Sequence, residues 1–384
     1  MSNRGVRSSE RQSSRVAFGL RHARGVILNF QAETGAYPAS PTFSAYRGYS
    51  WFRDGSFIAD AMSVAREVES ASAFHDWCSH VVIERESQIR RIVEQADSGT
   101  PVPASQMLPT RFTLEGQEGT DDWWDFQLDG YGTWLWAVVE HARRHSLPTD
   151  LWQEAASLVA SYLISSWKRP CFDWWEEHAE QVHVSTLGCV AAGLRAVISA
   201  GWLTEELHEE AQNAYGNVMD VITSQGVENG HLTKWLGSAE VDASLSALIA
   251  PLKVIPADSA LARRTVEEID KQLQFEGGVH RFRADKFFGG GRWPLLSCFL
   301  GLAEYECGNK RRAAELFGWA LAQMDDSGDL IEQVDGHLLD EEHREYWIKR
   351  WGTPALPLLW SHAMLLRLAA DLNGETLGLR GEQE

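Results

Sequence analysis

Two adjacent tryptophans stand directly before two adjacent glutamates in the stretch Asp173-Trp174-Trp175-Glu176-Glu177. An indole ring removes water from a neighbouring carboxyl group and raises its pKa, so such a carboxyl can stay protonated near neutral pH. The formal net charge of -19 favours the same protonated form. A protonated carboxyl beside flat aromatic rings is suited to protonating the leaving oxygen of a glycosidic bond. The alternative is an ordinary helix end that carries a solvated pair of glutamates.

Cleavage of a glycosidic bond also requires a second carboxylate on the other side of the sugar. The candidate is Glu332, in the segment Ile331-Glu332-Gln333. Glu176 and Glu332 are far apart in the sequence, so they must reach one sugar from two different loops. Enzymes that invert the anomeric configuration hold their two carboxyl groups roughly 6.5–9.5 Å apart, which leaves room for the attacking water.

The composition is typical of a folded protein, and its tryptophan content favours carbohydrate binding. A hydrophobic content of 44% over 384 residues is sufficient for a core. The 17 tryptophans exceed what such a core needs, and sugars present flat C–H faces that stack on indole rings. The alternative is that the tryptophans simply fill the core. The charge of -19 and the pI near 5.1 argue against nucleic acid or an anionic membrane surface as a partner.

Cysteine and histidine usage predicts neither a disulfide framework nor a metal centre. The number of cysteines is odd and none of the five forms a C-x-x-C pair, which fits a reducing compartment and predicts a cytoplasmic protein. The segment from Met1 to Arg15 has no apolar region typical of a signal peptide, and no run of 18 apolar residues predicts a membrane span. The 13 histidines are scattered, so no metal or cofactor is assigned.

Apolar residues recur at helical spacing along most of the chain, which predicts an all-α protein with about twelve helices and little strand. Residues 1–13 are expected to be a disordered polar tail, 14–373 a single catalytic barrel and 374–384 a polar C-terminal tail. The expected helices include those at about 14–31, 71–96, 185–200, 239–250, 258–275, 293–307, 310–325 and 354–371.

The connections between these helices are of two alternating kinds. Short turns lead from every second helix to the next, whereas the other connections are long loops. The charged and aromatic residues of chemical interest cluster in the long loops. In a closed ring of six helix pairs, an (α/α)6 barrel, all long loops emerge at one face, so the pattern predicts one barrel with one site. The loop segments concerned are 53–54, 123–129, 174–177, 235–242, 281–293 and 332–360.

Six short motifs resemble those of glycoside hydrolase family 15, the glucoamylase family, and they occur in the family's order from about residue 40 to 371. The resemblance implies an (α/α)6 barrel, with Glu176 as the general acid and Glu332 as the general base. The motifs are Trp51-Phe52-Arg53-Asp54, Gln127-Leu128-Asp129-Gly130 with Trp123 upstream, Asp173 to Glu177, Arg281 to Asp285 with Trp293, Ile331-Glu332-Gln333, and Pro357 to Ala363 with Trp360.

The resemblance also implies a sugar-binding pocket. Arg53 and Asp54 would hydrogen-bond the hydroxyls of the terminal sugar, and Arg281 would be a second sugar ligand. Glu177 would raise the pKa of Glu176 or contact the departing sugar. Turn ion pairs, salt bridges and core packing are the alternatives for these residues. The other expected substrate-binding residues are Trp51, Trp123, Gln127, Asp129, Trp174, Trp175, Trp293 and Trp360.

A tyrosine is expected beside the attacking water. The family places this tyrosine a fixed distance before the motif aspartate, where this chain has Arg47. Gly48 resembles a one-residue insertion that moves the tyrosine to Tyr46, and Tyr49 is the other candidate. Phe287 and Phe288 stand where relatives often have a tyrosine, so the hydroxyl of Tyr46 is expected to lack one hydrogen-bond partner and to act more freely on the proton.

The function expected from these residues is exo-acting, inverting hydrolysis of isomaltose or short α-glucosides, with β-glucose as the product. The compact chain most resembles isomaltose glucohydrolases within the family. Trp174, Glu177 and Gln127 are expected to form the wall for the leaving sugar, and a bulky ring there favours an α-1,6 over an α-1,4 link. The alternatives are an α-1,4-preferring glucoamylase, a sugar phosphorylase or epimerase, and a non-catalytic carbohydrate-binding protein.

Overall fold

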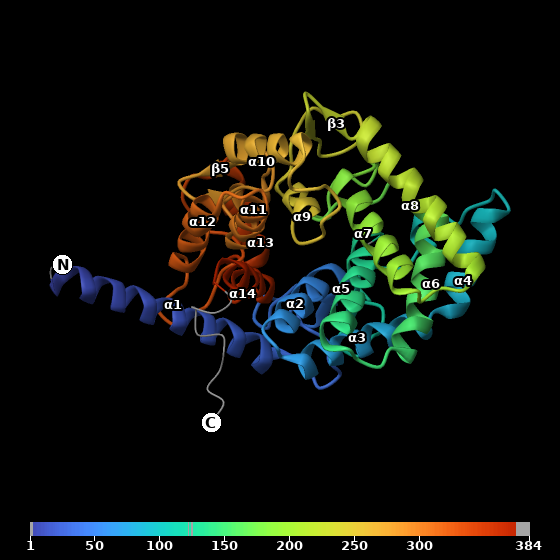
Figure 1. The fold of residues 1–384 in the computed structure, drawn as a ribbon, viewed down its shortest axis with the longest axis horizontal. Helices are drawn as coiled ribbons and strands as arrows, with labels where there is room; N and C mark the ends of the chain where they lie inside the picture. The colour runs from blue at the N-terminus through green and yellow to red at the C-terminus, as the bar shows by residue number, and fades with distance from the viewer. Residues whose placement is uncertain (1–2, 122, 124–125, 374–384) are drawn as a thin grey trace.

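The computed structural model describes residues 3–121, 123 and 126–373. Six helices form an inner ring in which each contacts the next, and the last contacts the first (Figure 1). This closed ring confirms the predicted all-α barrel of helix pairs. In chain order the inner helices are α2 (Phe52–Val64), α5 (Asp129–His145), α7 (Val184–Ala200), α9 (Ser246–Ile249), α11 (Pro294–Glu306) and α14 (Leu359–Asn373).

The remaining long helices surround this ring and connect its members. They bury one face each, whereas α2, α7 and α11 are buried along nearly their whole length. Helices buried on all sides need small residues where they meet: a Cβ on Gly132 of α5 would lie 2.4 Å from the Cys189 carbonyl oxygen of α7. The outer helices are α1 (Asn3–Phe30), α3 (Val68–Ile83), α4 (Glu86–Asp97), α6 (Asp150–Ser166), α8 (Glu205–Gln225), α10 (Ala260–Leu273) and α12 (Lys310–Ala322).

The long loops before the inner helices carry the only strands of the described ranges. The strand β1 (Tyr49–Trp51) pairs antiparallel with β2 (Arg111–Thr113), with Trp51 opposite Arg111. Two smaller hairpins join β3 (Val227–Glu228) to β4 (His231–Leu232) and β5 (Gln274–Phe275) to β6 (Gly278–Val279). The loops also contain the short 3-10 turns η1 (Ala104–Gln106), η2 (Ala243–Leu245) and η3 (Phe287–Gly289).

Three of the helix limits differ from the sequence-based expectation. The helix expected at 71–96 is divided into α3 and α4, because Arg85 leaves the helical conformation and donates hydrogen bonds to the carbonyls of Val81 and Gly116. Helix α1 begins at Asn3 rather than at Ser14, since the polar residues before Ser14 include good helix formers although they lack apolar periodicity. The helix expected at 239–250 is reduced to η2 and α9. The predicted tail 374–384 lies outside the described residues.

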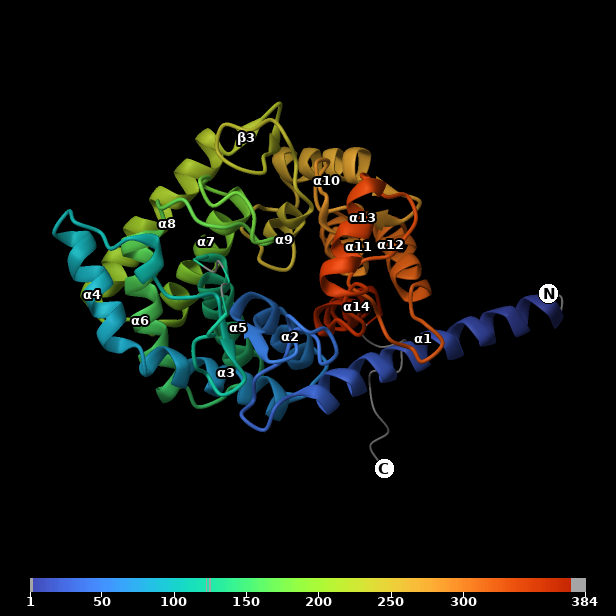
Figure 2. The ribbon, with the colours of Figure 1, turned by 180° about the vertical axis from the view of Figure 1, so that it is seen from behind.

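A further helix, α13 (Glu341–Trp351), lies within the long loop before α14 and was not predicted. Figure 2 shows α13 in front of α11, on the face of the barrel that is turned toward the viewer. Among the described helices, none is long and apolar enough to cross a membrane.

Candidate active site

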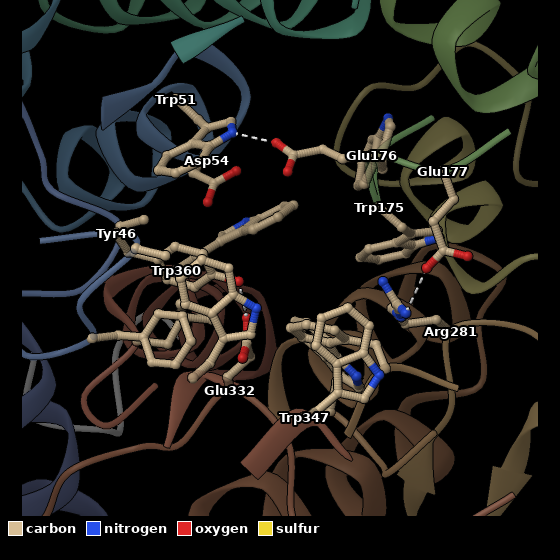
Figure 3. Close-up of a pocket in the computed structure, with 18 of the residues that line it drawn as sticks. Tyr46, Trp51, Asp54, Trp175, Glu176, Glu177, Arg281, Glu332, Trp347 and Trp360 are labelled. Atoms are coloured by element: carbon tan, nitrogen blue, oxygen red, sulfur yellow. Dashed lines mark hydrogen bonds and ion pairs between the residues drawn. The ribbon is translucent and has the colours of Figure 1, made fainter. Parts of the chain in front are cut away.

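A cavity of about 690 Å³ lies where the N-terminal ends of the inner helices meet. Its walls come from the loops before α2, α5, α7, α11 and α14, so residues far apart in the sequence converge as the predicted barrel requires. The loop before α9 lines an adjoining hollow instead, through Trp235 to Glu240. Figure 3 shows Glu176 and Glu332 entering the cavity from opposite sides.

Glu332 is buried in a setting suited to a general base. Its side chain is 2% exposed, and the hydroxyl of Tyr46 donates a hydrogen bond of 3.0 Å to its Oε1. Its Oε2 is also buried and has no hydrogen-bond partner within the described residues, so this oxygen is free to accept a proton. Burial raises the pKa of Glu332 to about 7, while the Tyr46 hydrogen bond and the positive charge of Arg281 oppose the rise. A base is most effective when its pKa lies near the working pH.

Tyr46 and Tyr49, the two tyrosine candidates, occupy different places. Tyr46 lines the cavity and contacts Glu332, whereas the hydroxyl of Tyr49 donates to Asp121 over 2.9 Å. Burial and the charges of Glu332 and Glu176 raise the pKa of Tyr46 well above its ordinary value, so its hydroxyl keeps its proton. The geometry therefore favours Tyr46 as the tyrosine beside the base.

Glu176 is held in place by its own loop and by Trp51. The indole Nε1 of Trp51 donates to Glu176 Oε1 over 2.5 Å. Burial raises the pKa of Glu176, although Arg53 and Trp51 partly oppose it, and a raised pKa suits a general acid. The backbone of Glu176 is left-handed with φ 63°, a conformation that is costly for a residue with a side chain and needs support from its surroundings.

Asp173 supplies much of this support. Its Oδ1 accepts hydrogen bonds from the backbone amides of Trp175 and Glu177, each over 2.9 Å, and its carbonyl accepts the amide of Glu176. The buried ammonium of Lys234 lies 3.4 Å from Asp173 and 2.8 Å from Asp242.

Asp242 in turn accepts a hydrogen bond from the indole Nε1 of Trp175 over 3.0 Å. Lys234 and Asp242 therefore fix the loop that carries Glu176, although sequence reasoning assigned neither of them to the site. Asp242 also caps η2 by accepting from the amide of Ser244. That aspartate-before-a-turn pattern was a local signal for Asp242, whereas Lys234 had none.

Arg53 and Asp54 form an ion pair on the cavity wall, with Arg53 Nε 3.3 Å from Asp54 Oδ1. Burial raises the pKa of Asp54 to about 7. Gln127 and Asp129 were expected to contact the sugar, but both are fully buried and absent from the cavity wall. They bind the Arg53 guanidinium instead, over 2.5 and 3.3 Å, so they position a wall residue rather than form the wall.

Arg281 closes the opposite side of the cavity. Its guanidinium donates to Glu177 Oε1 over 3.0 Å and pairs with Asp285 over 2.5 Å. It also lies 5.3 Å from the ring of Trp175 and 5.5 Å from that of Trp293. Figure 3 shows Arg281 beside Glu177 and Trp175, so the charge of Arg281 is held at the wall by carboxylates and rings.

The predicted tryptophans all reach the cavity, but not in equal ways. All six line it, and three of them, Trp51, Trp174 and Trp360, are almost fully buried. The other three are Trp123, Trp175 and Trp293. Four other aromatic rings surround Trp174, which therefore packs into the core as well as lining the cavity, and its role as a wall for the leaving sugar stays a prediction. These rings belong to Phe57, Trp175, Phe299 and Trp360.

Comparisons with known proteins also identify relatives of this chain among glycosidases. The sequence model of "Glycosyl hydrolases family 15" matches residues 17–317. An isomaltose glucohydrolase of Kribbella flavida is 48% identical over 359 residues, which cover 92% of each chain. Solved structures of a wild-type glycosidase and of a glycosidase variant in complex with glucose are 46% and 45% identical, each with a TM-score of 0.92 over 94% of this chain and 98% of the other. A glucoamylase of Hormoconis resinae shares the fold at 16% identity, with a TM-score of 0.68 over 94% of this chain and 74% of the other.

Proposed function

Because the chain belongs to glycoside hydrolase family 15, we propose that this glycoside hydrolase releases glucose from the non-reducing end of isomaltose and short α-glucosides with inversion. The observation that carries the proposal is the pair of largely buried carboxylates, Glu176 and Glu332, on opposite sides of one cavity. Both have raised pKa values, as acid–base work near neutral pH requires.

The mechanism follows from this arrangement. Glu176 donates its proton to the glycosidic oxygen, and the bond from that oxygen to the anomeric carbon breaks. Glu332 takes a proton from a water through its free Oε2, and the water oxygen bonds to the anomeric carbon from the other side. An α-linked substrate therefore gives β-glucose. Arg53 and Asp54 bind the terminal hydroxyls, which favours removal of one sugar at a time from a chain end.

Support for isomaltose as the substrate comes from the Kribbella flavida relative. The bulky ring of Trp174 lines the cavity, so a preference for the α-1,6 link through this ring stays a prediction. A preference for maltose remains the alternative within the family. The cytoplasmic location stays a prediction, and it would restrict the enzyme to imported small sugars.

Two measurements test the proposed function. Proton NMR during early hydrolysis of isomaltose is expected to show β-glucose as the first product, before mutarotation. The value of kcat/KM is expected to be higher for isomaltose than for maltose. First release of α-glucose would rule out inversion, and a clear preference for maltose would identify an α-1,4-directed enzyme. Binding of isomaltose without glucose release would favour the non-catalytic alternative, and a requirement for phosphate would favour a phosphorylase.

Tyr46→Phe is expected to lower kcat on isomaltose by about tenfold to a hundredfold, since a positioned group of this kind acts on the proton transfer step. The substitution removes the hydroxyl that contacts Glu332 and keeps the ring that packs on Phe43. Tyr49→Phe is the matched control, because its hydroxyl contacts Asp121 and the side chain does not line the cavity. Full turnover by Tyr46→Phe would show that the hydroxyl takes no part in proton transfer.

A further inference from the structure

Helix α13 is unusual because it has no buried residue and yet lines the cavity. Trp347, Arg350 and Trp351 belong to the cavity wall, whereas the wall residues Arg53 and Asp54 of the inner helix α2 are buried. A helix that has no fully buried residue and still borders the cavity forms the outermost part of the wall.

The helix is held over the cavity mainly by its aromatic side chains. The ring of Trp347 lies 5.0 Å from that of Phe287, and the ring of Trp351 lies 6.3 Å from that of Phe43. An ion pair of 2.7 Å between Arg344 and Asp335 ties the helix to its own loop. These contacts place one face of α13 toward the cavity and leave its other face in solvent.

In the proposed mechanism, the terminal sugar occupies the inner part of the cavity. Arg53 and Asp54 stand at the start of the inner helix α2, and Glu176 and Glu332 define the position of the bond that breaks. A leaving sugar therefore extends outward from Glu176. Figure 3 shows Trp347 below Arg281 and across the cavity from Glu176.

We propose that α13 forms the outer wall of the leaving-sugar site and selects disaccharides over longer chains, with Trp347 and Arg350 as the specificity-determining residues. This inference rests on the proposed function. Trp347 offers an indole face for the leaving glucose, and the Arg350 guanidinium lies 5.5 Å from the Trp347 ring, where it can donate to sugar hydroxyls. A third sugar unit would have to extend past α13, so longer chains are bound less well than the disaccharide.

The test compares Trp347→Ala with wild type on isomaltose, isomaltotriose and α-glucosyl fluoride. Because stacking on an aromatic ring contributes on the order of one tenfold step in affinity, kcat/KM for isomaltose is expected to fall about tenfold, mainly through KM. The ratio of isomaltotriose to isomaltose turnover is expected to rise. The value for α-glucosyl fluoride is expected to change less than about twofold, since fluoride fills no leaving-sugar site.

Trp202→Ala is the matched control, because Trp202 is half-buried like Trp347, lies in the turn between α7 and α8 and does not line the cavity. This variant is expected to equal wild type on all three substrates. Unchanged isomaltose kinetics in Trp347→Ala, or an equal loss on isomaltose and α-glucosyl fluoride, would overturn the role of α13. A wild-type enzyme that hydrolyses α-glucosyl fluoride but not isomaltose would instead overturn the proposed function.

Discussion

Replacing Glu332 by glutamine is expected to lower kcat on isomaltose by about 10²–10⁴-fold, the usual contribution of a general base. Glutamine preserves the shape of the side chain and can still accept the hydrogen bond from Tyr46, but it cannot take a proton from water. Because α-glucosyl fluoride also needs an activated water, its hydrolysis is expected to fall by a similar factor. Glucose release in steady state measures both losses.

The same substitution is expected to stabilise the protein at alkaline pH. Burial raises the pKa of Glu332 to about 7 in the folded protein, well above the value of an exposed glutamate. The folded state therefore holds this proton more tightly, so the glutamate costs stability progressively as pH rises from about 4.5 to about 7. Above that range Glu332→Gln is expected to gain up to about 3 kcal/mol in the free energy of unfolding.

Denaturant unfolding at pH 8 and pH 4 provides the measurement, and the gain is expected only at pH 8. Glu209→Gln, the same change on the exposed surface of α8, is the control and is expected to be neutral at both pH values. Normal turnover in Glu332→Gln would exclude this residue as the base. A loss of turnover with lower stability at pH 8 would indicate damage to the fold.

Glu176→Gln is expected to lower kcat on isomaltose by about 10²–10⁴-fold as well, but here because departure of the leaving sugar is slowed. The variant cannot protonate the glycosidic oxygen, and a sugar is a poor leaving group without that proton. Fluoride departs without a proton, so hydrolysis of α-glucosyl fluoride is expected to be largely retained. The difference between the two substrates separates loss of the acid from loss of the binding site.

The control for this prediction is Glu180→Gln, an exposed glutamate of the same loop outside the cavity wall. It is expected to behave as wild type on both substrates. Equal losses of isomaltose and α-glucosyl fluoride hydrolysis in Glu176→Gln would exclude a role as general acid. Activity close to wild type on isomaltose would show that another residue is the general acid. Glu177 is the nearest carboxyl in the sequence.

Much of the barrel was predictable because its information is local. Inner helices such as α7 and α11 are continuous apolar segments that end at turn residues, and such segments are visible directly in the sequence. The alternation of short turns and long loops also placed Glu176 and Glu332 on one face. Helix α13 was not predicted, because its apolar residues are only partly buried, against η3 and Phe43, and it has no fully buried stripe to produce a helical pattern.

The sequence by itself determined which residue types are present for acid–base chemistry and in which order they occur. Tertiary structure alone decided which of them face the cavity: Gln127 and Asp129 lie behind Arg53, while Trp347 reaches the wall from α13. It also brought Lys234 and Asp242 to the loop of the general acid. The physical reason is that burial and side-chain contacts depend on segments distant in the chain, whereas helix periodicity and short motifs depend on neighbours.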